Sequence, residues 1–126
     1  MFRGVRQMIR HEQRKQLHHY IIHDLAVKSL QQDYVAIEKL KMKAVYLPLF
    51  DGLLKEIRNE TFKSKNLLQK QKIRVVSMTR IDEFFSDLHV TTAGNDEVFR
   101  YANQALKTQV EHLINSYINH GESHSK

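Results

Sequence analysis

The sequence predicts a mainly α, α+β fold with three N-terminal helices, one β-hairpin and one long C-terminal helix. Apolar residues recur every three or four positions over most of the chain, whereas between about 72 and 92 they alternate with polar residues. Four glycines and one proline leave few places to turn, so the chain should consist of a few long elements. Its 126 residues fit a single domain, expected over 1–119, with a polar, disordered tail over 120–126.

The first helix is expected over about 2–30. Its apolar stripe is interrupted at Gln13 and Gln16, and past residue 20 the helix becomes apolar all round. That end must therefore be covered on more than one side. The apolar stripe consists of Phe2, Val5, Ile9, Tyr20, Val27 and Leu30. A second stripe, about 120° away, consists of Arg3, Arg6, Arg10 and Arg14.

A second helix over about 34–47 and a third over about 49–68 are expected to follow. Asp33 is a suitable N-cap for the second helix. Pro48 lacks the N–H that a continuous helix needs, so the chain should break there and restart. The inner face of the third helix is expected to consist of Phe50, Leu53, Leu54, Ile57, Thr61, Ser64 and Leu68.

The period then changes to two. The segments 72–81 and 84–92 both alternate and are rich in β-branched and aromatic residues, and Asp82-Glu83 lies between them. This pattern predicts a hairpin over about 72–92. A helix over 81–90 is the alternative, because Ile81, Phe84, Phe85 and Leu88 also fit a period of 3.6.

A loop at about 91–97 should lead into the last helix, expected over about 96–118. Its apolar residues recur at spacings of three and four, as in a coiled coil, so the stripe can pack within the subunit or across a dimer. We expect an oligomer contact formed by Phe99, Leu106, Val110, Leu113 and Tyr117.

Several classes of function lack support in this sequence. With no cysteine there is no disulfide, no thiolate nucleophile and no cysteine-based zinc site. No nucleophile elbow, phosphate-binding glycine loop or dinucleotide fingerprint occurs, so we expect no enzyme activity, no catalytic residue and no cofactor. No apolar run is long enough to span a membrane and no signal peptide is recognisable, which favours a cytoplasmic location.

Two histidines four residues apart, His19 and His23, lie on one face of the first expected helix. This spacing can place two imidazole nitrogens on one metal ion. However, no carboxylate stands next to His19, and nothing in the sequence shows that further ligands converge from Asp24, Glu111 or His112. A partly buried polar cluster is the commoner outcome, so no metal site is predicted.

The net charge of +6 is distributed unevenly along the chain. Residues 1–80 hold 17 Lys/Arg and 7 Asp/Glu, a net charge of +10, whereas residues 81–126 hold 3 and 7, a net charge of −4. Such asymmetry favours an anionic partner for the first two-thirds of the chain. The alternative is that the two parts neutralise each other within or between subunits.

The third expected helix carries the strongest functional signal. Opposite its apolar face, within about 120° of arc, lie Lys55, Arg58, Asn59, Phe62, Lys65 and Asn66. Lysine and arginine neutralise phosphates, asparagine and arginine can bond base edges, and an exposed phenylalanine can stack on a base. No acid occurs between Thr61 and Arg80, so the basic surface should continue through Lys72, Arg74 and Arg80.

The sequence therefore predicts a small nucleic-acid-binding protein, in the form of a dimeric DNA-binding regulator. Three helices, a hairpin and a final helix follow one another as in winged-helix proteins, in which the third helix enters the major groove. The rival hypothesis is a homo-oligomeric structural or adaptor protein that acts through protein contacts and binds no nucleic acid. In that case Phe62 serves as a second contact surface for a neighbouring helix.

Overall fold

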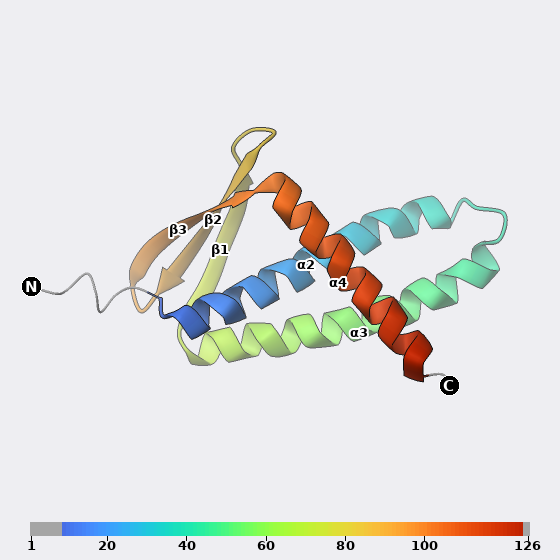
Figure 1. Ribbon diagram of the computed structural model, residues 1–126, viewed down its shortest axis with the longest axis horizontal. Coiled ribbons are helices and arrows are strands. Elements are labelled where there is room, and N and C mark those ends of the chain that lie inside the picture. Colours follow the sequence, from blue (N-terminus) through green and yellow to red (C-terminus); the bar gives the residue numbers. More distant parts are fainter. Residues whose placement is uncertain (1–8, 125–126) are drawn as a thin grey trace, which may run out of the picture.

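The computed structural model describes residues 9–124, so Phe2, Arg3, Val5 and Arg6 of the expected first helix lie outside the described residues. The chain forms a mixed α+β fold in which two long helices precede a three-stranded sheet and a final helix (Figure 1). The elements are α2 (His11–Ile37), α3 (Lys43–Lys70), β1 (Ile73–Arg80), β2 (Phe85–Thr92), β3 (Asn95–Ala102) and α4 (Asn103–His124).

The expected second helix is absent, so two helices precede the sheet and not three. Residues 34–37 are the last turn of α2, and the chain reverses over 38–42, where the Glu38 and Lys39 amides bond back to the carbonyls of Tyr34 and Ala36. Asp33 therefore lies within α2 and caps no helix. The apolar residues of 34–47 are therefore divided among the end of α2, the reversal and the start of α3, which together form an antiparallel helical hairpin.

Pro48 does not end a helix, contrary to the sequence prediction. It lies within the second turn of α3, where its missing N–H removes one backbone hydrogen bond. The helix continues because its later turns bury Leu54 and Ile57, which are 4% and 0% exposed, against α2. Burial along the rest of α3 outweighs the local loss at the proline.

The three strands form an antiparallel sheet in the order β1-β2-β3. The expected hairpin is present as β1 and β2. The helical alternative for 81–90 is wrong, since residues 81–84 form the connection and Phe85–Thr92 is β2. In the connection, the Asp82 carboxylate accepts hydrogen bonds of 2.8 Å from the amides of Phe84 and Phe85. This Asp82 turn fixes the register of the two strands.

The third strand was not predicted, and it replaces the loop and the first turn of the expected last helix. A two-residue turn at Ala93 and Gly94 precedes it, with φ of 51° and 92°, so Thr92 pairs directly with Asn95. Positive φ at both turn residues matches the twist of two adjoining strands. The element order is consequently helix, helix, three strands, helix, which is not the winged-helix order.

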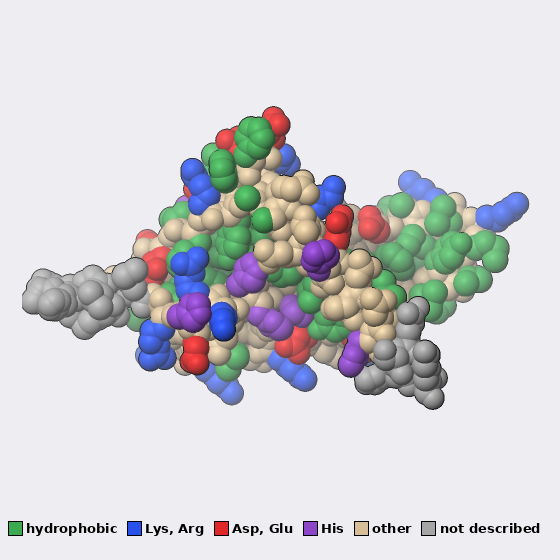
Figure 2. All heavy atoms as spheres, viewed as in Figure 1, with side chains coloured by type: hydrophobic (Ala, Val, Ile, Leu, Met, Phe, Trp, Pro, Cys, Tyr) green, Lys and Arg blue, Asp and Glu red, His purple; other side chains and the backbone are tan. Residues whose placement is uncertain are grey.

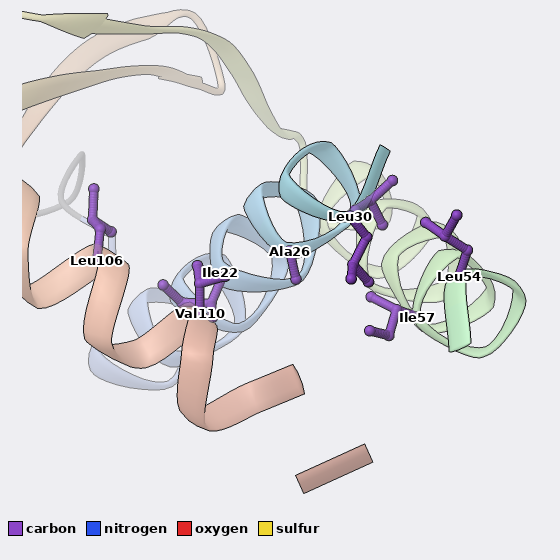
Figure 3. Close-up of a cluster of buried hydrophobic side chains, with 8 residues drawn as sticks. Ile22, Ala26, Leu30, Leu54, Ile57, Leu106 and Val110 are labelled. Atoms are coloured by element: carbon purple, nitrogen blue, oxygen red, sulfur yellow. The ribbon is translucent and has the colours of Figure 1, made fainter. Parts of the chain in front are cut away.

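Two clusters of buried side chains hold the layers together, and α2 contributes to both. One face of the sheet packs on the first half of α2 through Leu17, Ile21, Leu68, Ile73, Leu88 and Val90. The second half of α2 packs against α3 and α4 and forms the other cluster with them (Figure 3). This cluster consists of Ile22, Ala26, Val27, Leu30, Leu54, Ile57, Leu106 and Val110. Figure 1 shows that α4 crosses α2 and that the α2–α3 connection projects beyond this crossing.

Most of the expected oligomer contact lies in the protein's own core. Leu106 and Val110 are 8% and 7% exposed, and Leu113 and Tyr117 pack against the same cluster. Phe99 belongs to β3 and not to the last helix, and the Arg14 guanidinium lies 4.2 Å from its ring centre. The apolar stripe of α4 is therefore used within the chain. The helix runs to His124 and so continues into the segment expected as a tail.

Candidate nucleic-acid interface

The outer face of α3 is exposed along its length because only the opposite face packs on α2. The buried face consists of Leu54, Ile57, Ser64 and Leu68. The six residues expected at the interface all lie on the other side and are exposed: Lys55, Arg58, Asn59, Phe62, Lys65 and Asn66. Phe62 is 65% exposed and has no helix packed on it within the described chain.

This face leads into a cluster of cations where the end of α3, the start of β1 and the start of α2 meet. Two hydrogen bonds join the helices there: Gln13 Nε2 donates to Gln71 Oε1 at 3.0 Å, and Gln71 Nε2 donates to Gln16 Oε1 at 2.6 Å. The eight exposed cations of this region, which we call the basic end, are Arg10, Arg14, Lys15, Lys63, Lys65, Lys70, Lys72 and Arg74. Figure 2 shows blue side chains around the start of α2 and the end of α3.

The cations of the basic end are not neutralised by carboxylates. Among the side chains that the structure describes, those of residues 9–120, the ion pairs are His19–Glu60, Lys28–Asp24 and Arg100–Asp87. None of these includes a cation of the basic end. Neutralisation by the acidic last third of the chain therefore does not occur at this surface, and the positive potential remains available to an anionic ligand.

A groove of about 280 Å³ crosses the junction between α2, α3 and β1. Its floor is apolar and includes Ile21, Leu68 and Leu88. Lys65 and Arg74 line it from α3 and β1, and the ion-paired Lys28 and Asp24 line it from α2. The geometry thus brings two of the expected interface residues, 9 positions apart in sequence, to the same groove.

Two further expected cations, Lys72 and Arg80, lie outside this groove. Lys72 occupies the turn between α3 and β1, with φ of 63°, and its carbonyl accepts the Ala93 amide. It therefore belongs to the basic end. Arg80 lies at the far end of β1, about 20 Å along the strand from Arg74 at the usual rise per residue. Its Nε donates to the Asp82 carbonyl at 3.1 Å, so the structure separates it from the other cations.

Sequence reasoning assigned only three of the eight cations of the basic end, Lys65, Lys72 and Arg74, to the predicted interface. Arg10 and Arg14 were recognised as a stripe of their own, but Lys15, Lys63 and Lys70 were not assigned to any site. These residues come together only because α2 and α3 run antiparallel, which places the start of one helix beside the end of the other. Had the helical hairpin been recognised, the acid-free run 61–80 beside an arginine-rich helix start would have indicated the cluster.

The histidines of α2 form the expected polar cluster. The ring centres of His19 and His23 lie 4.1 Å apart, and His19 Nε2 is 3.0 Å from Glu60 Oε2. His23, which is 3% exposed, has Nδ1 at 2.8 Å from the His19 carbonyl and Nε2 at 3.0 Å from the Tyr117 hydroxyl. Because a carbonyl only accepts, Nδ1 donates to it, and Nε2 accepts from the tyrosine.

His23 makes stability depend on pH. Burial lowers the pKa of its imidazole below the usual 6.5. The unfolded chain therefore takes up a proton at a higher pH than the folded chain does, and protonation favours unfolding. We expect the free energy of unfolding to be highest above pH 6.5 and to fall as the pH drops from 6.5 towards the lowered folded value.

Urea unfolding between pH 8 and pH 5 measures this effect. The His23→Gln variant, which cannot titrate at this position, should lose stability less steeply over the acidic part of that range. Equal slopes for the variant and the wild type would contradict the assignment.

The described residues contain no group of three or more His, Asp or Glu side chains placed to hold a metal ion. Within the same residues, no helix is long and apolar enough to cross a membrane. His18 is also engaged, since its Nε2 bonds to Gln109 Oε1 and its ring stacks on Tyr101.

The fold and this surface define a small α+β protein, built on a helical hairpin with one strongly basic end. The chain belongs to the YhjD protein family, whose model matches residues 8–122. That match runs from the start of α2 almost to the end of α4. No curated protein and no solved structure matches the chain.

Proposed function

We propose that this protein binds nucleic acid through the outer face of α3 and the basic end. The observation that carries the proposal is the gathering of eight exposed cations, none of them paired with a carboxylate of the described chain, on adjoining parts of α2, α3 and β1. Lysine and arginine side chains arranged in this way neutralise consecutive phosphates and release their counterions.

Other residues of the surface extend the contact beyond phosphates. Phe62 presents an open aromatic ring on which a base can stack, and Asn59 and Asn66 lie beside it as hydrogen-bond donors and acceptors. These groups are few compared with the cations. The binding we propose is therefore driven mainly by the backbone and tolerates many sequences.

The proposed role is binding and not catalysis, and the proposed compartment is the cytoplasm. The winged-helix form of the hypothesis is not retained, because α3 is one arm of a hairpin and not the third helix of a winged-helix domain. A dimeric regulator is likewise not part of the proposal, since the α4 stripe on which it depended is used in the core.

Salt dependence tests the proposal. Fluorescence anisotropy with a labelled duplex should show tight binding at low ionic strength. The association constant should fall steeply with added KCl, with a slope of log K against log salt of about −4.5 if five of the eight cations contact phosphates. Absence of binding to duplex and single-stranded probes at low ionic strength would contradict it.

A further inference from the structure

The end of the helical hairpin opposite the basic end is covered by exposed apolar side chains. We call this group, at the end of α2, the start of α3 and the turn between them, the apolar tip. Its members are 41% to 68% exposed and are Val35, Leu40, Met42, Val45, Tyr46 and Leu49. Figure 2 shows hydrophobic side chains, in green, gathered over the projecting end of the molecule. An exposed apolar patch of this kind indicates an interaction site.

The tip is apolar on more than one side. At 100° per residue, Val45 and Leu49 lie about 140–180° from Leu54, so they are turned away from the contact of α3 with α2. Val35 lies about 180° from the buried Ala26 around α2. A partner protein covers one face of a helix pair, whereas lipid surrounds an inserted helix end on all sides. This distribution favours lipid.

The charges of the tip favour an anionic surface. Lys39, Lys41 and Lys43 alternate with Leu40 and Met42 in the turn and outnumber its one acid, Glu38. All three lysines are exposed, and none forms an ion pair with a carboxylate among residues 9–120. A second copy docked tip to tip would bring six such lysines together, which disfavours self-association. Lysine stems can lie along apolar surface while their ammonium groups reach lipid phosphates.

We infer that the apolar tip inserts into the interfacial layer of an anionic lipid bilayer. Met42, Val45 and Leu49 reach the boundary of the acyl chains, the lysines of the turn contact the headgroup phosphates, and the Tyr46 ring lies at the level of the headgroups. The contact is peripheral, with no helix crossing the bilayer. It uses the end of the molecule opposite the basic end and does not depend on nucleic-acid binding.

A tryptophan reporter tests insertion directly, because the chain contains no tryptophan. Leu49→Trp places the reporter in the tip. Phe62→Trp is the matched control, since both positions are on α3 and are 68% and 65% exposed. With vesicles of equimolar phosphatidylglycerol and phosphatidylcholine, the emission of Leu49→Trp should shift to shorter wavelength and be quenched by brominated lipid. The emission of Phe62→Trp should not change.

The control separates insertion of the tip from simple electrostatic attraction of the basic end to anionic vesicles. With attraction alone, both tryptophan reporters would stay in water. Unchanged emission of Leu49→Trp and of a second reporter, Met42→Trp, overturns the inference. So does an equal shift at Phe62→Trp. The emission of Leu49→Trp could instead shift with protein concentration in the absence of vesicles while sedimentation shows a dimer. That result would assign the tip to contact with a second copy and would also overturn the inference.

The lysines of the turn supply a second measurement. Lys41→Gln combined with Lys43→Gln should weaken binding to these vesicles about 25-fold, since each lysine near an anionic bilayer surface contributes a factor of about five. Vesicle affinity equal to that of the wild type, or equal affinity for pure phosphatidylcholine vesicles, contradicts the proposed role of charge.

Discussion

Replacing both Lys65 and Arg74 with glutamate is expected to weaken duplex binding about 100-fold at moderate ionic strength, because two attractions to phosphates become repulsions. Both side chains line the same groove at the basic end, and neither forms an ion pair with a carboxylate of the described chain. The salt slope should also become shallower by about two units, one for each lost phosphate contact. Anisotropy titrations over a range of KCl concentrations measure both quantities.

Lys41→Glu combined with Lys43→Glu is the matched control, since it changes the net charge by the same amount at the other end of α3. Lys43 and Lys65 are about 33 Å apart along the helix, several screening lengths at physiological salt. Duplex binding should therefore remain within a few-fold of the wild type. Equal losses in the two double variants would show that net charge, and not the basic end, determines binding.

Ile57→Ala is expected to lower the free energy of unfolding by about 3 kcal/mol. The Ile57 side chain is fully buried between α3, α2 and α4, so truncation removes apolar contacts and leaves a cavity in the cluster shown in Figure 3. The urea midpoint should fall while the m-value stays unchanged.

Leu49→Ala, on the same helix but 68% exposed, is the control and should alter stability by less than about 0.5 kcal/mol. If the two variants have the same stability, the arrangement of α3 against the core is incorrect.

The helical period correctly identified which face of α3 is buried. Leu54, Ile57 and Leu68 were expected on the inner face and are at most 4% exposed, while the six polar and aromatic residues opposite them are exposed. This prediction succeeded because the buried face of a long helix can be recognised from the spacing of its own apolar residues alone. The β1–β2 hairpin was predicted for the same reason, since alternation with a period of two is local to each strand.

The third strand was missed because two periods overlap in it. Phe99, Ala102 and Leu106 are spaced by three and four residues, as on a helix, although Phe99 and Tyr101 point to one side of β3 as in a strand. The turn before β3 uses Ala93 at a φ of 51°, where an asparagine or glycine would have indicated a hairpin. The pairing with β2, which the sequence does not display, decides between the two periods.

The basic end could be predicted only in part, because it depends on how two distant segments meet. Lys65, Lys72 and Arg74 follow from one acid-free run of sequence. Arg10, Arg14 and Lys15 join them through the antiparallel hairpin, whose turn was hidden by the expected second helix. The same turn leaves Leu40, Met42 and Leu49 exposed, which the sequence did not reveal.

The position of α2 between the two buried clusters has a consequence for how the molecule comes apart. Leu17 and Ile21 hold the sheet, and Ile22 and Ala26, within the next turns, hold α3 and α4. Unfolding of α2 exposes both clusters to water at once. Neither the sheet nor the α3–α4 pair then keeps enough buried apolar surface to stay folded. Between residues 9 and 124 we therefore expect no boundary at which proteolysis could release a fragment that stays folded, and unfolding of this part should be a single cooperative event.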